Sequence, residues 1–169
     1  VSLSRGGADA DVVREFDTVK KAFVEGGFFL PEAKNSASWK DLDTILVGTD
    51  FGPGSMTDSG YPRIYKEWKR GTPLAEATTV IEGKQTDVSV FAYREWDHGR
   101  VRDWAGRSPD FYTNEMFLIE GGELARIDKP DDASMGTWDD QVLFSLRSAW
   151  TIGDKTWPAG ALLITPLAD

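Results

Sequence analysis

Cysteine is absent from this chain of 169 residues, and histidine occurs only once, at His98. Without cysteine there are no disulfides and no thiolate metal sites, and the redox compartment cannot be inferred. A Ser-His-Asp triad would need His98 as its base. The segment around it, Trp96-Asp97-His98-Gly99-Arg100, is typical of an exposed hairpin tip, so we expect a solvated loop residue there. The same scarcity argues against a metal centre.

Long apolar runs are also missing, and the longest fall far short of the roughly 20 residues that cross a bilayer. No signal-peptide pattern is present. Because the sequence starts at Val1 without an initiator methionine, we expect a piece of a longer protein. Neither a phosphate-binding loop nor a dinucleotide fingerprint occurs, and Gly52-Pro53-Gly54-Ser55 lacks the spacing of a nucleophile elbow. We therefore predict no catalytic residue, no metal and no cofactor in this chain.

Basic side chains are outnumbered, because 19 lysines and arginines stand against 28 aspartates and glutamates, for a net charge of −9. This acidity argues against nucleic acid and anionic membranes as partners. Aromatic residues are abundant, with seven Trp, nine Phe and four Tyr. Aromatic side chains suit half-buried, pleated surfaces and fill gaps between sheets, which favours an all-β fold. They are also suited to line a carbohydrate groove.

One segment, residues 31–50, sets the pattern for the chain. It contains a proline turn, a run of small polar residues, Trp39, and a bend formed by Asp41 and Asp43. An apolar run over 44–49 follows, and its composition predicts a buried strand.

This pattern returns later in the chain. A weaker copy occupies 130–146, with Trp138 lying 138 − 39 = 99 residues after Trp39. A more degenerate copy lies about halfway, where 82–87 leads into a predicted strand over 88–93. A period of about fifty residues is the size of one four-stranded β-propeller blade. We therefore predict an all-β chain that forms part of a β-propeller, with about three to four blades of four-stranded antiparallel sheets.

The repeat divides the chain into a partial blade, two full blades and a second partial blade, over 1–30, 31–83, 84–129 and 130–169. The two full blades have predicted strands over 37–39, 44–49, 63–68, 78–82, 88–93, 101–105, 111–119 and 123–127. In the first partial blade we expect strands over 12–16 and 22–24, the latter outermost, with 28–31 crossing to the next blade. In the last we expect strands over 142–146 and 161–165 and a hairpin around 153–156. Very little helix is expected.

Four pairs of acidic residues could carry chemistry. As calcium ligands or as glycosidase carboxylates they would need to converge on one site. Three of the four pairs fall in predicted turns, where aspartate side chains accept hydrogen bonds from backbone amides. Turn capping is therefore the favoured interpretation for Asp9/Asp11, Asp41/Asp43, Asp131/Asp132 and Asp139/Asp140.

Residues 11–17, 23–28 and 38–51, and most specifically 54–63 with 68–74, carry a resemblance to a known family. They resemble the N-terminal propeller region of bacterial prolyl oligopeptidase-type serine peptidases, and the resemblance covers essentially the whole chain. In that family a seven-bladed propeller covers an α/β-hydrolase domain, which holds the catalytic residues, and restricts entry to short peptides. The resemblance implies a bacterial, cytoplasmic protein whose partners are a hydrolase domain of the same parent chain and short peptide substrates. Because the hydrolase half is missing here, no catalytic residue is carried over.

The resemblance also suggests a gating loop, since residues 52–61 join the second and third strands of a blade. It would face the propeller tunnel or the hydrolase side, and the alternative is a loop packed over its own blade. The candidate gating residues are Gly54, Ser55, Thr57, Asp58 and Tyr61.

Other readings remain open. The chain could be a free-standing propeller or lectin-like binding module that stacks ligands on Trp96 and Trp104, a purely structural scaffold, or a glycosidase. An open arc of blades leaves sheet faces and strand edges uncovered, and repeat arrays normally cap such ends. We therefore also expect the isolated chain to self-associate or to be marginally stable.

Overall fold

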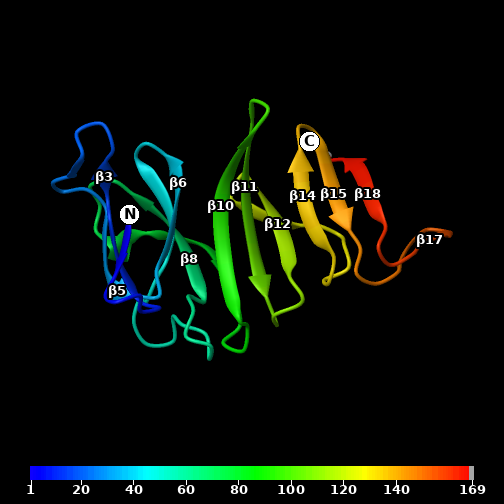
Figure 1. Cartoon of the computed structure of the whole chain (residues 1–169), viewed down its shortest axis with the longest axis horizontal. Helices are drawn as coiled ribbons and strands as arrows, with labels where there is room; N and C mark the ends of the chain where they lie inside the picture. Colours follow the sequence, from blue (N-terminus) through cyan, green and yellow to red (C-terminus); the bar gives the residue numbers. More distant parts are fainter. Residues whose placement is uncertain (168–169) are drawn as a thin grey trace.

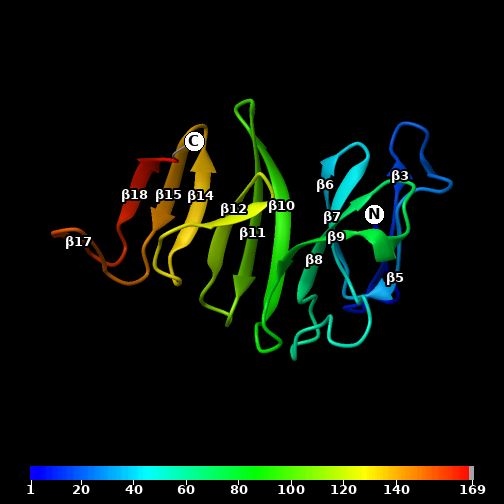
Figure 2. The same ribbon diagram turned by 180° about the vertical axis from the view of Figure 1, so that it is seen from behind.

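The computed structural model describes residues 1–167, and its regular structure is almost entirely β-strand (Figure 1). Four antiparallel sheets of three or four strands follow one another along the chain and stand in a row, with the N-terminal sheet at one end and the C-terminal sheet at the other; two further sheets are two-stranded hairpins. Figure 2 shows the same row from behind. Among residues 1–167, the one helical element is a short 3₁₀ turn, η1 (Leu74–Glu76). The all-β, blade-like architecture predicted from the repeat is confirmed.

The first blade differs from its prediction. Its sheet has the order β1-β2-β5, formed by β1 (Ser2–Ser4), β2 (Asp11–Arg14) and β5 (Phe29–Ala33). The strand expected outermost is instead half of a small hairpin, β3 (Phe16–Asp17) with β4 (Ala22–Phe23). That prediction was wrong, as was the expectation that 28–31 merely crosses to the next blade, because Leu30 is fully buried within β5. The sheet therefore runs past the expected division at residue 30.

The second blade has the order β6-β7-β8-β9. Its strands are β6 (Ser36–Asp41), β7 (Thr44–Gly48), β8 (Ile64–Lys69) and β9 (Thr78–Glu82). The four predicted strands are confirmed, with ends shifted by at most two residues. Gly48 pairs with Tyr65 across the sheet, and a Cβ atom at Gly48 would overlap the Tyr65 ring.

The third blade has the order β10-β11-β12-β13. Its strands are β10 (Ser89–Asp97), β11 (Arg100–Ser108), β12 (Glu115–Glu120) and β13 (Glu123–Arg126). The first two run longer than predicted, to a two-residue turn at His98 and Gly99, both with positive φ. The third begins at Glu115 rather than at residue 111, because Asp110 Oδ1 accepts hydrogen bonds from the amides of Tyr112 and Thr113 and holds a turn there.

The fourth sheet has the order β14-β15-β18. It consists of β14 (Ser134–Trp138), β15 (Gln141–Ser145) and β18 (Leu162–Pro166). A separate hairpin of β16 (Trp150–Ile152) and β17 (Lys155–Trp157) lies between β15 and β18 in the chain, where the sequence predicted a hairpin.

The core lies between the blades. The position of β7 between two neighbouring blades explains why its sequence contains a continuous run of apolar residues. Ile45 and Val47 belong to a buried cluster with Leu30 of the first blade. Leu46, which points to the opposite face, belongs to a second cluster with Val90 of the third blade. Successive residues of a strand face opposite sides of the sheet, so a blade covered on both sides needs apolar residues at every position.

The repeat is real, but its middle copy was misplaced. Trp39, Trp96 and Trp138 each lie at or near the end of the first strand of a blade, in β6, β10 and β14. The strand at 88–93 was matched to the second strand, whereas it belongs to the first strand of its blade. The spacings are uneven, 96 − 39 = 57 and 138 − 96 = 42 residues, which conceals the equivalence.

The row of sheets has two opposite edges. The hairpin edge holds the turns β6–β7, β10–β11 and β14–β15 and is uppermost in Figure 1. The loop edge, opposite, holds the β7–β8 loop (49–63), the link from β9 to β10 (83–88) and the β11–β12 loop (109–114).

Candidate functional site

The β7–β8 loop, which carries the predicted gating residues, has a rigid base. Asp50 Oδ1 accepts a hydrogen bond from the Gly52 amide at 2.8 Å. The Ser55 hydroxyl accepts one from the Phe51 amide at 2.8 Å and lies 2.7 Å from the Gly52 carbonyl oxygen. Gly52 and Gly54 both adopt positive φ, which glycine reaches without strain. This half of the loop is therefore held by its own short-range hydrogen bonds.

The second half of the loop is fixed to the link between blades. The Asp58 amide donates to the Gln85 carbonyl oxygen at 2.8 Å. The Thr57 hydroxyl lies 3.3 Å from the Val88 carbonyl oxygen and accepts a hydrogen bond from the Tyr61 amide. The loop thus bridges the second blade and the start of the third.

These contacts divide the predicted gating residues into two groups. Ser55 and Thr57 are 3% and 5% exposed, and their hydroxyls are engaged within the loop and the link. Gly54, Asp58 and Tyr61 are exposed. The first pair shapes the loop, and the last three are the ones that a partner or a substrate can touch.

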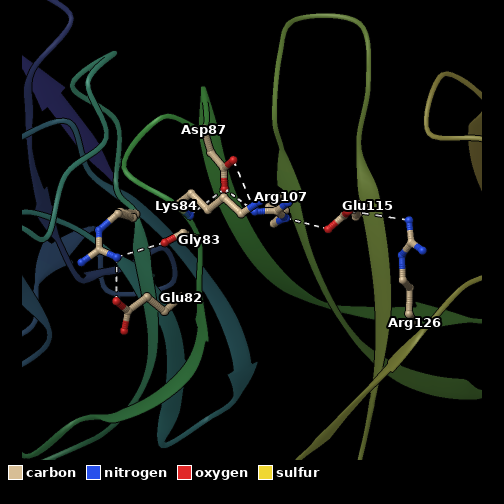
Figure 3. Close-up of polar contacts among 8 residues, drawn as sticks. Glu82, Gly83, Lys84, Asp87, Arg107, Glu115 and Arg126 are labelled. Carbon is tan, nitrogen blue, oxygen red and sulfur yellow. Dashed lines mark hydrogen bonds and ion pairs between the residues drawn. The ribbon is translucent and has the colours of Figure 1, made fainter.

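A chain of ion pairs crosses the loop edge beneath the loops (Figure 3). Asp87 is 2% exposed, and its Oδ2 accepts the Lys84 amide at 2.8 Å and lies 3.1 Å from Arg107 Nη1. Arg107 Nε donates to Glu115 Oε2 at 2.6 Å, and this hydrogen bond lowers the pKa of Glu115 below its ordinary range. Arg126 follows, 3.6 Å from Glu115. The link after β9 is thereby tied to β11 and β12.

Arg63, at the end of the β7–β8 loop, joins the loop to the same region. Its Nε donates to the Gly54 carbonyl oxygen at 2.8 Å, and its Nη1 donates to Glu82 Oε1 at 2.6 Å and to the Gly83 carbonyl oxygen at 3.0 Å. The loop conformation and the position of the link are therefore set by a shared guanidinium.

Two exposed aromatic residues on this edge were missed from the sequence. Phe111 and Tyr112 are 81% and 71% exposed at the tip of the β11–β12 loop. They were assigned to a strand, although Ser108-Pro109-Asp110 is a turn signal that could have placed them in a loop. The amide of Tyr112 donates to Asp110 at 2.7 Å, which fixes the backbone while the rings stay in solvent.

A cavity of about 330 Å³ opens beside Tyr61, lined also by Asp9, Lys34, Ser36 and Phe91. Lys34 Nζ lies 4.2 Å from the centre of the Tyr61 ring and 3.0 Å from Asp9. The exposed part of the β7–β8 loop therefore borders a recess at the start of the first strands of two blades.

The hairpin edge holds the chain's histidine, in the exposed turn predicted for it. His98 Nδ1 lies 2.6 Å from Asp97 Oδ1, and its ring centre lies 4.4 Å from that of Trp138. Of the two tryptophans suggested as stacking platforms, Trp96 is 58% exposed. Trp104 is fully buried and donates from Nε1 to Glu95 at 3.1 Å, so that part of the lectin-like reading is wrong.

The acidic pairs do not converge. Asp41 Oδ1 caps the Asp43 amide at 2.9 Å, the predicted turn role, and this hydrogen bond lowers the pKa of Asp41. Asp139 and Asp131 instead bind Arg100 and Arg126. Within residues 1–167, no three acidic or histidine side chains are grouped so as to hold a metal ion. The same residues contain no helix long and apolar enough to span a membrane.

Comparison with known proteins identifies relatives along the whole chain, although no protein-family model matches it. The uncharacterized peptidase y4nA of Sinorhizobium fredii is 38% identical over 163 residues, which cover 92% of this chain and 22% of that protein. The uncharacterized peptidase RP174 of Rickettsia prowazekii is 28% identical over 184 residues, covering 100% of this chain and 26% of that protein. The chain thus spans about a quarter of the curated relatives it matches.

Solved structures agree. A post-proline cleaving enzyme from Rickettsia typhi superposes with a TM-score of 0.88 at 28% identity, over 98% of this chain and 26% of that one. A chain from a structural and mechanistic analysis of two prolyl endopeptidases superposes with a TM-score of 0.61 over 82% of this chain and 21% of that one, at 15% identity. The second likeness concerns the fold alone.

Proposed function

We propose that the chain is a β-propeller segment of a prolyl oligopeptidase-type serine peptidase, and that it gates and size-selects peptide substrates without itself supplying catalytic residues. The partner would be an α/β-hydrolase domain of the same parent protein, in the bacterial cytoplasm, and the substrates short peptides. The observation that carries this proposal is the loop edge, where exposed side chains stand on a backbone fixed by hydrogen bonds.

A gate needs a base that stays in place and a tip that can contact a substrate. The base is supplied by Ser55 and Thr57, which are engaged in hydrogen bonds, and by Arg63. The tip is supplied by Asp58 and Tyr61, which stay exposed. Binding and catalytic residues are often carried by loops on a rigid scaffold, and this loop has that construction.

We also expect this chain to have no catalytic role of its own, for a separate reason. Activating a serine requires a base within hydrogen-bond reach. His98 is the chain's single histidine and lies on the hairpin edge, where Asp97 and Trp138 contact it, whereas Ser55 is buried on the loop edge. We expect the isolated chain to hydrolyse no proline-containing peptide.

The test uses a complete peptidase that carries this segment and two proline-containing substrates, an octapeptide and a peptide of about forty residues. Tyr61→Ala and Asp58→Ala should raise kcat/KM for the long substrate relative to the short one by about threefold or more, since they remove contacts at the tip. Val19→Ala, an exposed position in the β3–β4 turn, is the matched control. An unchanged ratio in both loop variants would argue against gating by this loop.

A further inference from the structure

Neighbouring blades of the row are not all joined in the same way. Leu30 of the first blade is buried in an apolar cluster that also contains Ile45 of the second. Leu46, on the opposite face of the second blade, is buried in a cluster with Val90 and Ala105 of the third. These two junctions are therefore closed by apolar side chains from both partners, and their burial stabilises the closed arrangement in proportion to the area removed from water.

The junction between the third blade and the fourth sheet is built differently. The buried apolar cluster beside it draws all its members from the fourth sheet and the residues that flank it: Ala133, Val142, Phe144 and Leu146. Trp104 points towards this junction, because its neighbour Ala105 belongs to the cluster shared with the second blade. Trp104 is fully buried, yet it is not a member of the fourth sheet's cluster. Among residues 1–167, no cluster of buried apolar residues therefore spans the third blade and the fourth sheet.

Polar contacts close this junction at the hairpin edge, and three of them converge on Asp139 in the β14–β15 turn. Its amide donates to Asp97 Oδ2 at 2.6 Å, and its Oδ1 accepts a hydrogen bond from Arg100 Nε at 2.8 Å. Its carbonyl oxygen accepts a third hydrogen bond, from Arg102 Nη2. We call these four residues the latch, because three belong to the third blade and one to the fourth sheet.

The latch lies where water can compete with it. The side chains of Arg100 and Asp139 are 38% and 49% exposed. A cavity of about 460 Å³ opens beside the latch and is lined by Arg102, by Leu118 of β12 and by Leu167, just beyond β18. Exposed ion pairs contribute little to stability, because solvent competes for both partners. The hairpin-edge side of the junction can therefore open at low cost.

The loop-edge side of the same junction is held by Lys129, in the link between β13 and β14. Its side chain is buried, and Nζ donates to the backbone carbonyl oxygens of Asn114, Pro130 and Ala133 at 2.9, 3.2 and 2.9 Å. Asn114 belongs to the β11–β12 loop, so this ammonium ties the third blade to the start of the fourth sheet. A buried charged group that loses its hydrogen-bond partners is strongly destabilising. We therefore expect this side of the junction to hold while the other opens.

We propose that the junction is a hinge, with Lys129 as its pivot at the loop edge and the latch as its closure at the hairpin edge. The fourth sheet moves away from the third blade while both keep their own strands paired. Local opening requires less free energy than global unfolding where few buried apolar contacts are broken. Hinges are formed by a few loop residues that absorb the change in backbone angles, and the link over 127–133 supplies them. The opening does not depend on the gating proposed for the loop edge.

Hydrogen exchange of the Trp104 indole N–H reports this opening, because the indole is buried at the junction and donates to Glu95 at 3.1 Å. The reference is the indole of Trp68, which donates to the Thr72 carbonyl oxygen at 2.8 Å within the second blade. Both are recorded by NMR in the 169-residue chain, and the backbone amides of β7 and β15 report unfolding of the second blade and of the fourth sheet. We expect the protection factor of the Trp104 indole to be at least about tenfold lower than that of the β7 amides.

Asp97→Ala removes the acceptor of the Asp139 amide and so opens the latch. Exchange of the Trp104 indole should accelerate at least about tenfold, because a hydrogen bond to a charged group is lost from the closed state alone. The Trp68 indole and the amides of β7 and β15 should keep their rates. Asp41→Ala is the matched control, since Asp41 ends the first strand of the second blade as Asp97 ends that of the third, but caps its own turn.

Arg100→Met is a milder variant that keeps the test open should Asp97→Ala fail to fold. It removes one hydrogen bond to Asp139 from a partly exposed side chain, so it should accelerate exchange of the Trp104 indole by about threefold.

Two results would overturn the hinge. In the first, the Trp104 indole is as protected as the β7 amides and neither latch variant accelerates its exchange. In the second, the β15 amides accelerate together with the indole, which means that the fourth sheet unfolds instead of moving as a unit. Neither result bears on the loop-edge gate, which Tyr61→Ala and Asp58→Ala test with substrates of different length.

Discussion

Replacing Arg107 by methionine removes the cation at the centre of the loop-edge ion pairs while keeping most of the side-chain volume (Figure 3). Asp87 would then stay 2% exposed without its arginine partner, although it would still accept the Lys84 amide. Glu115 would lose its 2.6 Å hydrogen bond but could turn towards Arg126. The damage should therefore fall mainly on Asp87.

The magnitude follows from burial. Breaking a buried ion pair by removing one partner costs about 3–5 kcal/mol, because the remaining charge is left uncompensated. The Arg107 side chain is 15% exposed, and the Lys84 amide still compensates part of the Asp87 charge. We expect a loss of about 2–3 kcal/mol in the free energy of unfolding for Arg107→Met.

Urea unfolding of four proteins would measure this: the wild type, Arg107→Met, Asp87→Asn and the double variant. Asparagine can still accept the Lys84 amide and carries no charge, so the double variant should recover at least about 1 kcal/mol relative to the sum of the single changes. Additive losses, or an Arg107→Met loss below about 0.5 kcal/mol, would refute the reasoning that Asp87 depends on Arg107.

Three further predictions concern the scaffold. Arg70 lowers the pKa of Glu15 below its ordinary value of 4.5, so this ion pair stabilises the fold above that pH. The contribution is lost as the pH falls through the lowered pKa. In urea unfolding between about pH 6 and 3, the free energy of unfolding of Arg70→Met should therefore fall less with decreasing pH than that of the wild type. Gly48→Ala should cost about 2 kcal/mol in thermal unfolding, because its Cβ meets the Tyr65 ring, while Gly136→Ala, which has open space, should cost less. Leu162 and Ile164 are exposed on β18, so sedimentation should show concentration-dependent self-association that a Leu162→Lys, Ile164→Lys variant reduces; a monodisperse wild-type monomer at all concentrations would contradict this.

Sequence patterns predicted the strands and turns of the blades because these depend on residues that are close together in the chain. The apolar run of β7 and the turn at His98 and Gly99 are each encoded within a few residues. The same patterns failed where tertiary contacts decide. The strand expected over 22–24 pairs with the strand just before it in the chain, because Asp17 caps the turn that joins the two. Residues 29–33 instead join the sheet of the first blade as β5, because Leu30 is buried there.

Only part of the candidate site could be predicted from the sequence. The β7–β8 loop was found from its length and composition, but the partners of Thr57 and Asp58 lie in the link near residues 85–88 and cannot be inferred from the loop itself. Trp96 and Trp104 looked alike in the sequence. Trp96 lies beside a turn, whereas Trp104 lies in a central strand between two neighbours, so the second is buried.

The most direct test of the gating account is the length of the longest proline-containing peptide that a complete peptidase carrying this segment cleaves. A ladder of peptides should be assayed before and after residues 54–61 are replaced by a short Gly-Ser turn. The account predicts that the cutoff moves to longer peptides while kcat/KM for the shortest peptide is retained. An identical cutoff in both proteins, with the blades still folded, would contradict it.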